Sequence, residues 1–187
     1  MKNMTKFVGM MAVAFALTQT LQASLITGNI GFTGGVTFDT SSAGTATEVT
    51  SWINPIVTLD SGAFTSIASG SSVTFAKPWT FTSGVVSNFW SVGGFTFELI
   101  SSAISAQSGT YPNGTVTVTG SGYVSGNGYS STLMSWSFTA QDPYASTDPV
   151  AWTFSASGAS LPDGGSTVML LGIALSGAAL LRKKLLI

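Results

Sequence analysis

The chain has 187 residues, of which only 7% are charged, whereas about a quarter of the residues in an ordinary soluble domain are charged. It contains no histidine and no cysteine, which excludes His-based catalytic triads, His- or Cys-ligated zinc sites and disulfides. Between residues 24 and 160 one lysine stands against six acidic residues, so no basic patch is available for nucleic acid or for an anionic membrane surface. We expect one domain that uses no metal or other cofactor.

Residues 1–23 have the pattern of a secretory signal peptide. Lys2 and Lys6 precede an apolar run from Phe7 to Leu17, and a more polar stretch leads to Ala23. A run of about 11 apolar residues is too short to cross a bilayer, which needs about 20. The sequence therefore predicts a signal helix, export, and cleavage after Ala23 by signal peptidase, and an uncleaved membrane anchor is the alternative.

Residues 24–160 alternate between apolar and polar side chains over short stretches and show no long helical periodicity. Asn127-Gly128 is the clearest hairpin signal, because a type I′ turn needs positive φ at both central residues. Pro55 and Pro78 each indicate a sheet edge, a bulge or a strand start, because proline has no N–H for the ladder. We predict an all-β fold, an antiparallel β-sandwich or jelly roll. The expected strands are 25–32, 36–39, 48–59, 72–82, 94–100, 115–119, 122–125, 133–140 and 152–156, with Gly34-Gly35 as one of the turns.

Aromatic residues are the candidates for ligand binding, because sugar rings stack on exposed aromatic faces. Trp52 shares a strand face with polar residues, and Trp90 follows Phe89, so that strict alternation turns one of this pair outward. Tyr123 and Tyr129 flank the predicted hairpin turn. These four residues are the predicted ligand-binding aromatics, with polysaccharide as the partner. Three other tryptophans lie two residues before a phenylalanine and are predicted to be core: Trp79, Trp136 and Trp152.

Acidic residues offer weaker candidates. Glu98 is the one acid inside a clear predicted strand, but a glycosidase needs a second carboxylate and the sequence indicates none. Asp142 and Asp148 each precede a proline in a loop that could supply oxygen ligands to calcium, although the spacing matches no calcium-binding repeat. We interpret Glu98 as a solvated strand residue and the two aspartates as turn residues, and we predict no catalytic residue and no metal site.

The C-terminal segment 161–187 has three parts. A motif over 161–167 begins Leu161-Pro162-Asp163-Gly164-Gly165, an apolar helix is expected over 168–181, and a basic end over 182–187 contains Arg182-Lys183-Lys184. At 1.5 Å per residue the apolar part extends about 21 Å, against about 30 Å of hydrocarbon. We predict a thin transmembrane helix with its basic cluster on the cytoplasmic side and the domain outside.

The arrangement of these three parts resembles the PEP-CTERM class of bacterial sorting signals, and in particular its VPDSG-CTERM variant. Leu161 replaces the valine of that variant, and Gly164-Gly165 replaces its Ser-Gly. The resemblance covers only this tail. It implies transient insertion into the inner membrane and recognition by an exosortase, a membrane transpeptidase of bacteria that make exopolysaccharide, with Pro162, Asp163 and Gly164 as substrate positions. The sortase signal LPxTG also begins Leu-Pro, but Gly164 stands in place of its threonine. A permanent, unprocessed anchor is a further alternative.

Together these features predict a non-enzymatic protein at the cell surface or in the extracellular matrix, with a structural or adhesive role. The alternative is an extracellular carbohydrate-binding module associated with exopolysaccharide. A third hypothesis, an enzyme that uses Glu98 and one aspartate, has the least support because no paired carboxylates are evident.

Overall fold

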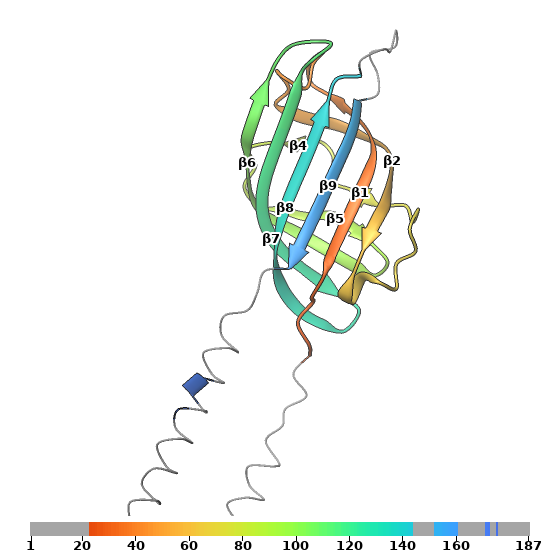
Figure 1. Ribbon diagram of the computed structural model, residues 1–187, viewed down its shortest axis with the longest axis vertical. Coiled ribbons are helices and arrows are strands. Elements are labelled where there is room, and N and C mark those ends of the chain that lie inside the picture. Colours follow the sequence, from red (N-terminus) through yellow and green to blue (C-terminus); the bar gives the residue numbers. More distant parts are fainter. Residues whose placement is uncertain (1–22, 144–151, 161–170, 173–174, 176–187) are drawn as a thin grey trace, which may run out of the picture.

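The computed structural model describes residues 23–143, 152–160, 171–172 and 175. Over these residues the chain forms nine strands and a short 3-10 helix, and the strands pair antiparallel throughout in one sheet of order β3-β5-β6-β7-β8-β9-β1-β2-β4 (Figure 1). The prediction of an all-β antiparallel fold is confirmed. The elements are β1 (Asn29–Phe38), β2 (Glu48–Asp60), η1 (Gly62–Phe64), β3 (Thr74–Phe75), β4 (Trp79–Thr80), β5 (Val86–Val92), β6 (Phe95–Ser108), β7 (Thr115–Gly126), β8 (Tyr129–Gln141) and β9 (Trp152–Ser160).

The sheet curls until its two edges meet at the segment 70–81. On one side of this segment, β3 pairs with β5, with Phe75 opposite Trp90. On the other side, Ser72 forms a bridge with Ile56 of β2, and β4 pairs with the start of β2 through Trp79 and Val49. We call this junction between β2 and residues 72–79 the seam. The predicted strand 72–82 is thus two short strands, because Pro78 interrupts it before β4.

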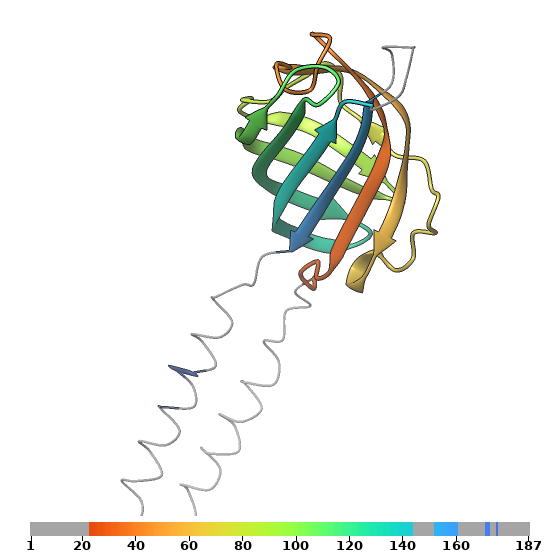
Figure 2. The same ribbon diagram turned by 45° about the horizontal axis from the view of Figure 1, so that its top comes forward.

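One curled sheet replaces the two stacked sheets of the predicted sandwich. Figure 2 shows β5 and β6 crossing behind β9 and β1, so one face of the sheet encloses the core and the other faces outward. The core is dominated by rings, and Trp136 packs 5.1 Å from Phe89 and 6.2 Å from Phe32, centroid to centroid. Edge-to-face and tilted ring pairs of this kind add to the area that the rings bury. The predicted core positions Trp79 and Trp136 are confirmed, whereas the Trp152 side chain lies outside the described part of the structure.

The hairpin predicted at Asn127-Gly128 joins β7 to β8, with φ of 50° at Asn127 and 79° at Gly128. These two positive values are those that a type I′ turn requires. The Asn127 side chain also donates a hydrogen bond of 2.9 Å from Nδ2 to the carbonyl oxygen of Gly93, in the turn between β5 and β6. Sequence patterning did not predict β5, so this contact between two neighbouring turns was not foreseen.

The prediction of a turn at Gly34-Gly35 is wrong. Both residues lie within β1, where Gly35 pairs with Ile53 of β2, and the register shifts between Thr33 and Gly35. The extra residues of β2 at this shift are Asn54, with φ of 47°, and Pro55. Of the three expectations for Pro55, a sheet edge, a bulge or a strand start, the bulge is the one that the structure shows. The two glycines opposite it belong to a continuous strand.

The residues that follow the predicted cleavage site are attached to β8. The backbone N–H of Ser130 donates to the carbonyl of Ser24 at 2.9 Å, and the N–H of Ile26 donates to Oγ1 of Thr132 at 2.9 Å. The predicted signal helix and the tail motif, Leu161 to Gly165, lie outside the described residues, as does the cluster Arg182-Lys183-Lys184. In the part of the chain that the structure describes, no helix is long and apolar enough to span a membrane.

Candidate functional site

Trp90, which was a candidate for exposure because alternation turns either it or Phe89 outward, is fully buried with 0% exposure. The reason is a bulge in β5: Val86 pairs with Leu99 and Trp90 pairs with Phe97, so three residues of β5 lie opposite Glu98 alone. Asn88 at the centre of this bulge has φ of 52°. The irregularity turns both Phe89 and Trp90 inward, where Trp90 stacks on Phe97 with ring centroids 5.4 Å apart. The prediction of an exposed Trp90 is wrong.

Trp52 is half-buried at the seam and is already in contact with other aromatic rings. Its ring stacks on Phe75 with centroids 4.3 Å apart and lies nearly parallel to Trp79 at 6.1 Å. Its Nε1–H donates a hydrogen bond of 2.9 Å to the carbonyl oxygen of Ala76. Because Phe75 packs against one face of the indole, that face is not available to stack on a sugar ring.

The two predicted tyrosines differ in exposure. Tyr129 is half-buried, and its ring lies 6.1 Å from that of Phe95, so it packs against the core. Tyr123 is 45% exposed on the outward face of β7. Among the four predicted aromatics, Tyr123 is the one whose ring is open to solvent.

Two neighbours flank Tyr123 on the same outer face. The ladders place it directly opposite Glu98 of β6 and opposite Leu133 of β8, which is 40% exposed. Side chains directly opposite each other on adjacent strands have Cβ atoms about 4.5–5.5 Å apart. Glu98 also accepts a long hydrogen bond of 3.4 Å at Oε2 from the hydroxyl of Ser87. An aromatic ring, a carboxylate and an aliphatic side chain thus form one row across three strands.

A depression of about 290 Å³ lies beside this row and is lined by Ser101, Ser102, Ala103, Thr119, Gly120 and Ser121. The register of β6 shifts between Leu99 and Ser101, which opens the strand locally. Gly120 contributes no side chain, and a Cβ there would lie 2.4 Å from the carbonyl oxygen of Ser101. Ser121 lies two residues from Tyr123 on the same face of β7, so the depression and the ring adjoin. We call Tyr123, Glu98, Leu133 and this depression the outer-face site.

The chemistry of the outer-face site is that of hydrogen bonding and ring stacking. Neither strand beside β6 carries an acidic residue, since the sequences of β5 and β7 contain none. Among the described residues, the strands paired with β6 therefore supply no second carboxylate beside Glu98 of the kind that glycoside hydrolysis uses. Ring stacking on Tyr123, with hydroxyls and one carboxylate around it, can hold a sugar ring in place. Sequence patterning identified Tyr123 and Glu98 but missed the depression, because it depends on a register shift.

Asp142 is buried and binds donors of the protein itself. Its Oδ2 accepts hydrogen bonds from the Ser42 hydroxyl at 2.7 Å and from the Gly114 N–H at 2.8 Å, and its Oδ1 accepts from the Ala43 N–H at 2.7 Å. This carboxylate joins the loop after β1 to the loop before β7. Asp148, the other predicted turn aspartate, lies outside the described residues. No group of three or more His, Cys, Asp or Glu side chains within the described ranges is placed to hold a metal ion.

Comparison with known proteins gives no relative. No family model matches the chain, and no curated protein or solved structure matches it.

Proposed function

We propose that the protein is an exported β-domain with an adhesive or structural role at the bacterial cell surface or in the extracellular matrix. The observation that carries this proposal is the position of the fold between the two predicted processing segments. The first strand begins at Asn29 and the last ends at Ser160, directly before the tail motif. Asn29 pairs with Ala159, so the chain enters and leaves the sheet at the same end (Figure 1). A domain connected in this way can be held at one end by its tail.

The N-terminal contacts are compatible with processing after Ala23. The bond from the Ser130 N–H to the Ser24 carbonyl and the bond from the Ile26 N–H to Thr132 both involve residues that cleavage leaves in place. The side chain of Ile26 is fully buried, so the retained segment is anchored in the core. Signal peptidase and an exosortase-type enzyme are the proposed partners, and the protein is inserted only transiently in the inner membrane.

Mass spectrometry of the mature protein from its native host tests this proposal. We expect a new N-terminus at Ser24 and loss of the apolar segment that ends at Leu181. The double variant Pro162→Ala with Asp163→Ala should stay membrane-bound with its tail attached. A mature surface protein that is intact through Ile187 would contradict processing of the tail, and an intact signal peptide in a cytosolic protein would contradict export.

The outer surface supports a role in contact rather than in catalysis. Strands β1, β7, β8 and β9 contain no charged residue, and the outward positions of β7 and β8 are mainly serine and threonine. Such a face can form many weak hydrogen bonds to a hydrated matrix. If the purified protein hydrolysed polysaccharides at enzymatic rates, the structural or adhesive role would be wrong.

A second candidate function, carbohydrate binding, is favoured by the outer-face site alone. Affinity electrophoresis in gels containing neutral or acidic polysaccharides tests it. Tyr123→Ala should abolish retardation, and Tyr123→Phe should keep most of it because the ring remains. Tyr111→Ala is the matched control, since Tyr111 is 46% exposed in a loop away from the site. Equal loss in both alanine variants, or no retardation of the wild type, would remove this function.

A further inference from the structure

The seam contains a second pocket, distinct from the outer-face site. Between the bridge of Ile56 with Ser72 and the pairing of Val49 with Trp79, β2 and the segment facing it form no ladder. A hydrogen bond from the Val73 N–H to the Pro55 carbonyl, 3.0 Å long, lies at one end of this gap. A pocket of about 190 Å³ opens there and is lined by Trp52, Pro55, Val73, Thr74, Phe75 and Lys77.

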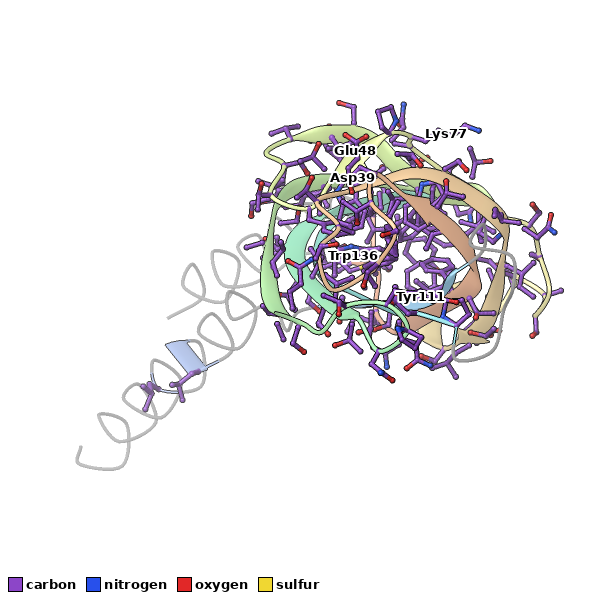
Figure 3. All side chains as sticks on the ribbon, turned by 90° about the horizontal axis from the view of Figure 1, so that it is seen from above. Asp39, Glu48, Lys77, Tyr111 and Trp136 are labelled. Carbon is purple, nitrogen blue, oxygen red and sulfur yellow. The ribbon has the colours of Figure 1, made fainter. Side chains whose placement is uncertain are left out.

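Lys77 gives this pocket a positively charged side chain, which the rest of the described molecule lacks. It is the one basic residue within residues 23–143 and 152–160, and it is exposed. Among those residues it has no ion-pair partner. Glu48, the acid on the neighbouring part of β2, accepts a hydrogen bond of 3.3 Å from Thr80 instead. Figure 3 shows Lys77 at the periphery of the molecule, away from Trp136 in the core.

The remaining walls of the pocket are mostly apolar. The indole of Trp52 is fixed by its hydrogen bond to Ala76, so it presents a constant surface, and the side chains of Pro55 and Val73 contribute further apolar surface. The hydroxyl of Thr74 is exposed beside them. For scale, an apolar cavity of about 150 Å³ holds one benzene molecule. The seam pocket therefore has room for one six-membered ring with a small substituent.

We propose that the seam pocket binds a six-membered ring that carries a carboxylate. The ring would lie against Pro55 and the part of Trp52 that borders the pocket, not against the indole face that Phe75 covers. Its carboxylate would pair with the ammonium group of Lys77. This site goes beyond the proposed surface role and does not depend on export, tail processing or sugar binding at Tyr123. The same chemistry occurs in a uronic-acid residue of an acidic polysaccharide and in a free aromatic carboxylate.

Nuclear magnetic resonance of the full chain in a mild non-ionic detergent tests the site. The indole N–H signal of Trp52 can be assigned by its loss in Trp52→Phe. We expect this signal to shift on titration with benzoate or with trigalacturonate, and not with benzamide or galactotriose, their uncharged counterparts. A response to benzoate alone identifies a free carboxylate as the ligand, and a response to trigalacturonate alone identifies an acidic polysaccharide.

Variants of Lys77 separate charge recognition from adventitious binding. Lys77→Met should weaken carboxylate binding about fivefold, the upper range for a solvent-accessible ion pair, and Lys77→Arg should retain it. Because Lys77 is exposed, the other indole signals should keep their positions in both variants, which verifies the fold. Equal affinity in Lys77→Met, equal binding of the uncharged compounds, or no shift with either carboxylate would overturn the proposal. None of these outcomes bears on export or on Tyr123.

Discussion

The hydroxyl of Ser42 donates a hydrogen bond of 2.7 Å to the carboxylate of Asp142, which lies 100 positions later in the chain. The same carboxylate accepts bonds from the backbone N–H groups of Ala43 and Gly114. A charged group with three donors can be buried because its lost hydration is replaced. Asp142 thus fixes two loops at one end of the curled sheet.

Removal of this carboxylate should destabilise the fold strongly. Asp142→Ala leaves three donors without their acceptor, and we expect the free energy of unfolding to fall by about 3 kcal/mol or more. Ser42→Ala removes one donor and should cost about 1–2 kcal/mol. Urea unfolding followed by tryptophan fluorescence measures both. A loss below about 1 kcal/mol in Asp142→Ala would show that the three bonds do not hold these loops.

Asp39 should make stability depend on pH in the acid range. Burial raises the pKa of Asp39, but hydrogen bonds from the Thr47 hydroxyl and from the N–H groups of Thr47 and Glu48 outweigh it and lower the pKa below 3.8. The folded-state pKa lies below the unfolded one, so this stabilisation is present above about pH 4 and is lost as pH falls through the folded value. Asp39→Asn should be less stable than wild type at pH 6 and converge with it near pH 2 in thermal unfolding. A constant difference across this range would contradict the assignment.

Position 128 of the turn at Asn127-Gly128 should not accept a β-carbon without strain. Gly128 has φ of 79° and no heavy atom within 4 Å of a Cβ placed there, so Gly128→Ala tests backbone conformation alone. We expect a loss of about 1–2 kcal/mol. Gly84→Ala is the control, because Gly84 also has open space around it but no positive φ. Equal stabilities of the two variants by urea unfolding would argue against the type I′ turn.

Trp90 and Tyr123 are both predicted ligand-binding aromatics, but their replacement by alanine should affect stability to very different extents. Trp90→Ala removes a fully buried ring that stacks on Phe97, and we expect a loss of about 3–5 kcal/mol. Tyr123→Ala should change stability by less than about 0.5 kcal/mol, because the ring projects to solvent. Thermal unfolding of both variants checks this contrast. A stability loss at Tyr123 comparable with that at Trp90 would place its ring in the core and remove the outer-face site.

The pattern of alternation predicted most of the strand positions because it reports which side of a sheet each residue faces. Strand β2 and the turn at Asn127-Gly128 were predicted closely for this reason. The same rule failed at Phe89-Trp90, where a bulge at Asn88 breaks the period of two and both side chains are buried. It also missed the seam, because no local sequence pattern indicates that residues near Trp52 and Lys77 lie close together where the two edges of the sheet meet.

The sequence by itself determined an antiparallel β-domain rich in buried rings, the absence of histidine and cysteine chemistry, and the expectation of two processing segments around the domain. Tertiary structure decided which aromatics are accessible and that Lys77 lines a pocket. It also decided that the Asp142 carboxylate holds two loops together by hydrogen bonds. The physical reason is that burial and proximity depend on strand register. In β5 a bulge that sets three residues opposite one changes the direction of a side chain. The curl of the sheet also brings together residues that no spacing along the chain connects.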